Sequence, residues 1–140
     1  MQDNKESLTL VKNDSHRYYV DSQGRTQGKS IGFAGTAFKL FEYNYVDNLK
    51  DGECIIYWYG INIIQFKFNY SKGLLEGETI VYYESGKIKY KGNYVNNNKE
   101  GLWIQYNDDN ENTEKEFKYY ENGIEYEVPS IQVKNARKKI

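Results

Sequence analysis

The stretch from Glu76 to Tyr106 reads EGETIVYYESGKIKYKGNYVNNNKEGLWIQY, and its internal pattern decides the fold. After Glu-Gly come an apolar run, a turn signal at Ser85-Gly86 and an alternating run that ends at Tyr94. Glu100-Gly101 then begins the same pattern again. Two runs of strand-forming residues separated by a turn that contains glycine predict a β-hairpin. The stretch is therefore one hairpin unit and the start of the next.

Four copies of this unit follow one another along the chain. Each copy has an anchor glycine after a polar residue, and the anchors stand 24, 25 and 24 residues apart: Gly28, Gly52, Gly77 and Gly101. Three residues after each anchor is an isoleucine: Ile31, Ile55, Ile80 and Ile104. Five residues after each anchor is an aromatic residue: Phe33, Tyr57, Tyr82 and Tyr106. A constant period of this size indicates a repeat architecture, in which each unit packs against its neighbours.

The second half of each unit alternates between aromatic and polar residues, as in Phe41-Glu42-Tyr43-Asn44. A tyrosine closes each alternation seven residues before the next anchor or before Tyr126: Tyr45, Tyr70, Tyr94 and Tyr119. Period-two alternation predicts strands that pack on one side only. We expect strands near 29–34, 38–46, 53–59, 62–70, 78–84, 87–95, 102–107 and 113–120. The expected turns are Ala34-Gly35, Tyr59-Gly60, Ser85-Gly86 and 108–110.

The predicted fold is all-β: an open, twisted antiparallel meander of stacked β-hairpin repeats. Residues 16–128 form a single repeat domain, in which 123–128 open a partial last copy. Residues 1–15 are expected to be a flexible N-terminal arm that adds at most a short edge strand. Residues 129–140 are a basic C-terminal tail with Lys134, Arg137, Lys138 and Lys139.

Hairpin units with this repeat period of 24 to 25 residues, and with a tyrosine seven residues before the anchor, resemble MORN repeats. More closely, the chain resembles the bacterial MORN-like variant of toxin–antitoxin antitoxins, with 94–103 (YVNNNKEGLW) as the nearest match. The resemblance covers about 17–128, although the first copy departs from it with Gly32 and Ala34 where the other copies carry bulk. It implies a non-enzymatic, protein-binding antitoxin or immunity protein that neutralises a toxin by stoichiometric binding. The alternative is a structural or membrane-proximal scaffold that self-associates through its repeat ends, with the basic tail on anionic lipid.

Composition argues against most other classes of function. The formal net charge of −1 recruits neither nucleic acid nor an anionic membrane. Cys54 is the only cysteine, which excludes an intramolecular disulfide and a multi-cysteine metal site. The only histidine, His16, is expected to be solvated, and we see no Ser-His or Cys-His pair. We therefore expect no catalytic residues, no cofactor and no metal.

The candidate partner-binding residues lie opposite the isoleucine ladder, where the copies differ and both tryptophans occur. They are Ile56, Trp58, Tyr83, Trp103 and Gln105, with Asp108 and Asp109 at the acidic rim; the acidic turn lacks the spacing of an EF-hand. Two interpretations stay open: the termini cover this face, or a partner protein such as a toxin binds it, because Trp and Tyr anchor interfaces. No apolar run approaches a membrane span, and the start lacks a signal sequence. A cytoplasmic protein is expected, and an exported mature form also fits.

Overall fold

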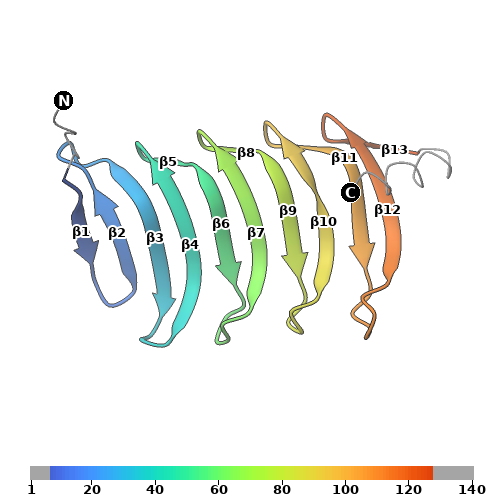
Figure 1. Cartoon of the computed structure of the whole chain (residues 1–140), viewed down its shortest axis with the longest axis horizontal. Coiled ribbons are helices and arrows are strands. Elements are labelled where there is room, and N and C mark those ends of the chain that lie inside the picture. Colours follow the sequence, from blue (N-terminus) through green and yellow to red (C-terminus); the bar gives the residue numbers. More distant parts are fainter. Residues whose placement is uncertain (1–6, 128–140) are drawn as a thin grey trace, which may run out of the picture.

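The computed structural model describes residues 7–127, and every regular element in that range is a strand. All of these strands lie in one open antiparallel sheet, which confirms the predicted all-β meander (Figure 1). Their order in the sheet follows the chain, and the short strands β5 and β8 pair with β4 and β7. The bounds are β1 Thr9–Lys12, β2 His16–Val20, β3 Thr26–Ala34, β4 Phe38–Val46, β5 Leu49–Lys50, β6 Gly52–Tyr57, β7 Ile64–Ser71, β8 Leu74–Leu75, β9 Gly77–Tyr82, β10 Ile88–Val95, β11 Asn98–Tyr106, β12 Glu114–Glu121 and β13 Ile124–Tyr126.

The expected strands correspond to β3, β4, β6, β7, β9, β10, β11 and β12. The structure adds β2, which the sequence pattern did not predict, and β1, which lies in the expected N-terminal arm and pairs with β2. β13 is the opening of the expected last copy. The predicted basic tail at 129–140 lies outside the described residues.

Type I′ turns join consecutive repeats, all at the same end of the strands. Both central residues have positive φ in each turn: Asp47-Asn48, Lys72-Gly73, Asn96-Asn97 and Asn122-Gly123. Such turns match the right-handed twist of the flanking strands, and Asn, Asp and Gly tolerate their backbone best. The anchor glycines follow a few residues later, also with positive φ, as at Gly52 (91°). The period of the repeat is therefore fixed by a backbone conformation that favours glycine.

Hydrogen bonds connect each of these turns to the repeat before it. The polar residue directly before the anchor accepts a hydrogen bond from the first backbone N–H of the next turn. Glu76, for example, accepts one from the Asn96 N–H at 2.8 Å. The same contact recurs in every copy: Gln27 with Asp47, Asp51 with Lys72, and Glu100 with Asn122. We call these contacts the turn staples. Each one satisfies a turn N–H and fixes the spacing between neighbouring repeats.

The strand register divides the side chains between two faces. Residues directly opposite in an antiparallel pair lie on the same face. Ser30 pairs with Tyr43, Cys54 with Phe68, and Thr79 with Gly92. The variable positions of the first strands therefore share a face with the aromatic residues of the second strands, and we call it the aromatic face. The isoleucine ladder lies on the other side, the isoleucine face, where Ile55 pairs with Lys67 and Ile80 with Lys91.

One tyrosine was assigned wrongly to the repeat pattern. Tyr119 was placed in register with Tyr45, Tyr70 and Tyr94, but Gly101 pairs with Tyr120, as Gly77 pairs with Tyr94. Tyr119 lies on the isoleucine face instead, opposite Leu102. The reason is the longer loop between β11 and β12, which shifts the last strand by one residue. A shift of one residue moves every side chain of a strand to the other face.

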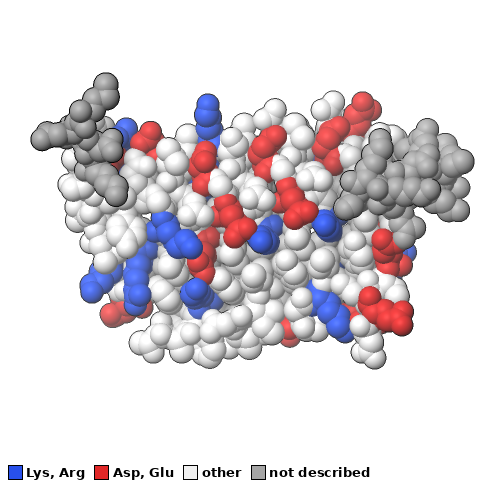
Figure 2. Space-filling model, viewed as in Figure 1, with Lys and Arg blue, Asp and Glu red and all other residues white. Residues whose placement is uncertain are grey.

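The isoleucine face carries paired charges. Lys67 contacts Glu53 at 3.0 Å and Lys91 contacts Glu78 at 3.3 Å. Glu42 accepts from both Lys39 and Lys29 and from the Tyr57 hydroxyl. Figure 2 shows the resulting mixture of blue and red across the middle of the molecule. Exposed ion pairs of this kind stabilise little individually, so they contribute little to the stability of the sheet.

Candidate binding groove on the aromatic face

Aromatic rings contact one another on the aromatic face, both within a strand and between neighbouring strands. Phe41 stacks on Tyr43 at 4.5 Å between ring centroids, and Phe66 stacks on Phe68 at 5.5 Å. Trp103 meets Tyr94 edge-on at 5.2 Å. Within residues 7–127 the single sheet has no second layer to cover these rings. They therefore bury one another along the sheet, which is the way a thin β-protein obtains a core.

Four buried residues form one line across this face, whereas Ile104, at 4% exposed, is buried on the isoleucine face. The residue two positions after each anchor is nearly inaccessible: Ser30 2%, Cys54 0%, Thr79 2% and Trp103 7%. Burial also raises the pKa of the Cys54 thiol, so the thiolate form is disfavoured. This line and the rings above it therefore form the core on the aromatic face.

Two glycines make room for rings on this face. A Cβ atom at Gly92 would lie 2.2 Å from the Trp103 ring, and one at Gly32 would lie 2.2 Å from Phe41. Both glycines lie in strands, and neither has the positive φ of the anchors. Their role is steric: each lets a large ring lie flat against the backbone of the neighbouring strand.

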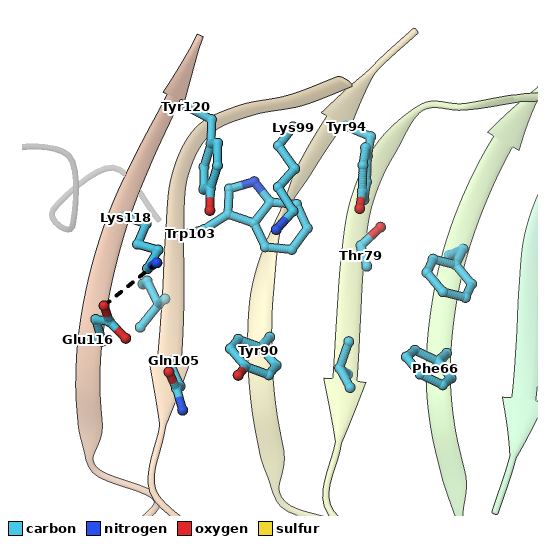
Figure 3. A pocket seen from close by; sticks show the side chains of 13 residues that line it. Phe66, Thr79, Tyr90, Tyr94, Lys99, Trp103, Gln105, Glu116, Lys118 and Tyr120 are labelled. Carbon is cyan, nitrogen blue, oxygen red and sulfur yellow. Dashed lines mark ion pairs between the residues drawn. The ribbon is translucent and has the colours of Figure 1, made fainter. Parts of the chain in front are cut away.

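A hollow of about 530 Å³ opens on the aromatic face between β7 and β12. We call it the aromatic groove, and Figure 3 shows its lining from the side opposite to Figure 1. Six of its thirteen lining residues are aromatic, and its polar end lies on β11 and β12. The lining residues are Phe66, Phe68, Thr79, Val81, Tyr90, Tyr94, Lys99, Trp103, Ile104, Gln105, Glu116, Lys118 and Tyr120.

Lysines lie over the rings of this face. The Lys99 ammonium is 4.5 Å from the Trp103 ring centroid and 4.8 Å from that of Tyr120. At the same position of an earlier repeat, Lys50 lies 4.0 Å from the ring centroid of Tyr43. Within residues 7–127 neither ammonium forms an ion pair with a carboxylate. Both cations are held by ring faces, an interaction that leaves part of each ammonium free for another partner.

Among the predicted partner-binding residues, Trp103 and Gln105 line the groove. Ile56 lies on the same face opposite Phe66, but outside the groove lining. Trp58 follows β6, and its indole nitrogen is buried without a hydrogen-bond partner among the described residues. The Tyr83 hydroxyl donates to the carbonyl of Tyr106 at 2.8 Å and so joins two repeats.

The two predicted rim residues, Asp108 and Asp109, lie in the loop between β11 and β12, away from the groove. Asp108 accepts a hydrogen bond from the Ser85 hydroxyl at 2.6 Å, which joins neighbouring hairpin loops. Asp109 accepts from the backbone N–H and the hydroxyl of Thr113. Both carboxylates therefore act in the structure as loop and turn acceptors. No three His, Cys, Asp or Glu side chains within residues 7–127 gather in a way that could hold a metal ion.

The prediction of a solvated His16 is wrong. β2 places its imidazole on the aromatic face, half-buried against Phe41, with Nε2 2.7 Å from the Ser30 hydroxyl. A Ser-His contact therefore exists, contrary to the expectation from sequence. Ser30 is only 2% exposed, and no carboxylate contact of His16 occurs in the described chain. This pair fits a structural hydrogen bond better than an activated nucleophile.

Sequence reasoning missed most of the groove. Tyr90, Tyr94 and Lys99 line the groove but are not among the predicted partner-binding residues. The recurrence of lysine two residues before the anchor, at Lys50 and Lys99, is a signal that the sequence does contain. Whether these lysines contribute to a binding site depends on the face of the sheet on which they lie, and only the strand register determines that face.

In comparisons with known proteins, no protein-family model matches this chain and no curated protein matches it. Within the described range, no helix has the length and apolar character that crossing a bilayer requires.

Proposed function

We propose that this chain is a non-enzymatic repeat module that binds a partner protein through the aromatic groove. The observation that supports this most strongly is the groove itself, an aromatic hollow of about 530 Å³ on an open sheet. Trp and Tyr are the residues most often found at the energetic centre of interfaces. Repeat sheets also present an extended surface on which a partner can lie.

The contrast between the two faces supports the aromatic face as the binding side. On the isoleucine face, Lys67 and Lys91 are paired with carboxylates of their own sheet. On the aromatic face, rings such as Phe66 and Tyr90 are half-buried and line a hollow. A half-buried aromatic wall gains free energy when a partner covers it, about 25 cal/mol for each Å² of apolar surface removed from water. The paired face gains much less.

The experiment compares three versions of the full chain as bait. Wild type is matched with a groove variant, Phe66→Ala with Tyr90→Ala, and with a control variant, Tyr82→Ala, on the isoleucine face. Proteins retained by wild type are identified by mass spectrometry, produced separately and titrated against each bait. The proposal expects the groove variant to lose at least tenfold in affinity, while the control stays within threefold. A partner that binds all three equally contradicts the groove as the binding site.

The antitoxin function rests on the resemblance to MORN-like antitoxins. It is supported by the kind of surface described above, which suits stoichiometric occlusion of another protein. The test is to express the identified partner in a bacterial host with and without this chain. Growth arrest by the partner alone, relieved by wild type but not by the groove variant, supports neutralisation. A partner that is harmless alone contradicts it.

A second candidate is a scaffold that self-associates through its repeat ends. It is favoured by the terminal strands, because within the described residues β1 pairs only with β2 and β13 only with β12. Strands of this kind offer unpaired backbone groups to another chain. Sedimentation velocity over a range of concentrations tests this: growing oligomers support the scaffold, and a constant monomer contradicts it.

A further inference from the structure

We propose that the occupant of the aromatic groove is an extended, acidic segment of a partner protein. The inference rests on the proposed function and adds the chemistry of the partner. It begins with the charges that face the groove. Lys99 and Lys118 line it, Glu116 is its carboxylate, and Glu125 lies at its edge on β13.

The two lysines and two glutamates at the groove balance in number, but they are not paired one to one. Lys118 contacts Glu125 at 3.3 Å and Glu116 at 3.8 Å, so it is already paired within the sheet. Lys99 and Lys50 have ring contacts and no ion pair within residues 7–127. Both ammonium groups, of Lys99 and Lys50, are therefore available to a carboxylate of another molecule. A carboxylate that approaches Lys99 gains a charge-assisted hydrogen bond without breaking an existing ion pair.

The shape of the site favours an extended segment. The groove crosses the strands from Phe66 on β7 to Tyr120 on β12 (Figure 3). Beyond it on the same face, Lys50 lies over the rings of Tyr70 on β7 and Tyr43 on β4. Lys50 and Lys99 are separated by four strand spacings of about 4.8 Å, which is about 19 Å. An extended chain rises about 3.3 Å per residue, so carboxylates about six residues apart reach both ammonium groups.

A polar group in the groove lining favours a peptide over a purely apolar ligand. Thr79 is 2% exposed, and its hydroxyl has no hydrogen-bond partner among the described residues. Buried hydroxyls in proteins almost always have a partner. The backbone of an extended segment supplies donors and acceptors at each residue, whereas a hydrocarbon chain supplies none.

The charge pattern also disfavours two other occupants. The C-terminal tail of this chain is basic, with Lys134, Arg137, Lys138 and Lys139, and like charges repel at Lys99. Single-stranded nucleic acid would stack on the rings, but it carries a phosphate at every nucleotide and so would meet Glu116 and Glu125 at one end of the groove, whereas a peptide can carry its carboxylates only where they face Lys99 and Lys50. Both become outcomes of the test.

The experiment uses two peptides of the same length and the same apolar residues. The basic probe is the segment 131–140, IQVKNARKKI, and the acidic probe is its charge-reversed version, IQVENAEEEI. Neither contains tryptophan, so the intrinsic fluorescence of Trp103 and Trp58 in the full chain reports binding. The acidic probe should bind at least tenfold more tightly than the basic probe. Added salt should weaken the binding of the acidic probe.

A matched pair of variants locates the interaction. Lys99→Met keeps the side-chain stem over the rings and removes the charge, so the affinity for the acidic probe should fall about three- to tenfold. The control Lys91→Met removes a lysine from the isoleucine face and should change that affinity less than twofold. Equal binding of the two probes, no binding of either, or an unchanged affinity in Lys99→Met overturns the inference. Tighter binding of a thymidine oligonucleotide than of the acidic probe also overturns it.

The result can be separated from the proposed function. If both peptides bind equally and both are lost in the Phe66→Ala, Tyr90→Ala variant, the groove remains a binding site and only the acidic partner is rejected. If a reconstituted partner binds the groove variant as tightly as wild type, the proposed function itself fails.

Discussion

The substitution Gly92→Ala examines the packing that underlies the aromatic groove. The backbone at Gly92 lies outside the left-handed region, so alanine is compatible with its conformation. The new Cβ would lie 2.2 and 2.3 Å from two atoms of the Trp103 ring. Carbon atoms in normal contact are about 3.5–4.0 Å apart, so the indole must move by more than about 1 Å. Trp103 is 7% exposed and cannot move without disturbing its neighbours.

The expected cost follows from this displacement. Forcing extra volume into a packed core destabilises a protein by about 1–3 kcal/mol. We expect Gly92→Ala to lower the free energy of unfolding by about 2 kcal/mol, and the Trp103 fluorescence to shift to the red. The assay is urea unfolding followed by circular dichroism. The control is Lys91→Ala on the opposite face, which should change the free energy of unfolding by at most about 0.5 kcal/mol.

A double-mutant cycle tests the cause. In a Trp103→Leu background the clash is absent, and Gly92→Ala should be neutral or stabilising by up to about 1 kcal/mol, because glycine is unfavourable inside a strand. The coupling between the two positions is then about 2 kcal/mol or more. If Gly92→Ala costs the same in both backgrounds, the ring is not the reason for the glycine, and the reasoning is refuted.

Three further predictions concern the rest of the sheet. Glu76→Ala removes the staple to the Asn96 N–H and should cost about 1 kcal/mol in urea unfolding, whereas Glu78→Ala removes only an exposed ion pair and should cost less than half of that. Burial alone raises the pKa of Glu42, but hydrogen bonds from two lysines and a tyrosine outweigh it and lower the pKa to about 2. The stability that Glu42 provides, about 1–2 kcal/mol after allowance for solvent, is therefore complete above pH 4.5 and lost as the pH falls toward 2; acid unfolding of Glu42→Gln should lack this step. Burial raises the pKa of Cys54, so its thiol should react with a disulfide reagent at least a hundredfold more slowly in the native protein than in urea; a comparable native rate would contradict its placement.

The repeat and the strands could be predicted from sequence because their causes are local. A positive φ at the anchor, as at Gly52, favours glycine wherever it occurs, so the period is visible in the residue types. Alternation such as Phe66-Lys67-Phe68 shows which residues of one strand share a face. The type I′ turns between repeats carry the same local information in their Asp, Asn and Gly residues, although we did not predict them.

The candidate site could not be predicted in the same way, because it depends on how strands are paired. Alternation within β9 does not determine whether Ile80 or Thr79 shares a face with Tyr94. The pairing of Gly77 with Tyr94 determines that Thr79 does. The partner of His16 was also hidden, because Ser30 reaches it only through the pairing of β2 with β3.

The sequence by itself determined an all-β chain of hairpin repeats and the position of each anchor. The reason is that the backbone conformation of a turn and the alternation of a strand depend on residues that are close in sequence. The tertiary structure alone decided which ladder became the core and which residues line a groove. The physical reason is register: a shift of one residue, as in β12, exchanges the two faces of a strand at no cost to its local pattern. Tyr119 and Tyr120 are chemically identical, and only the pairing with Gly101 places Tyr120 beside Trp103.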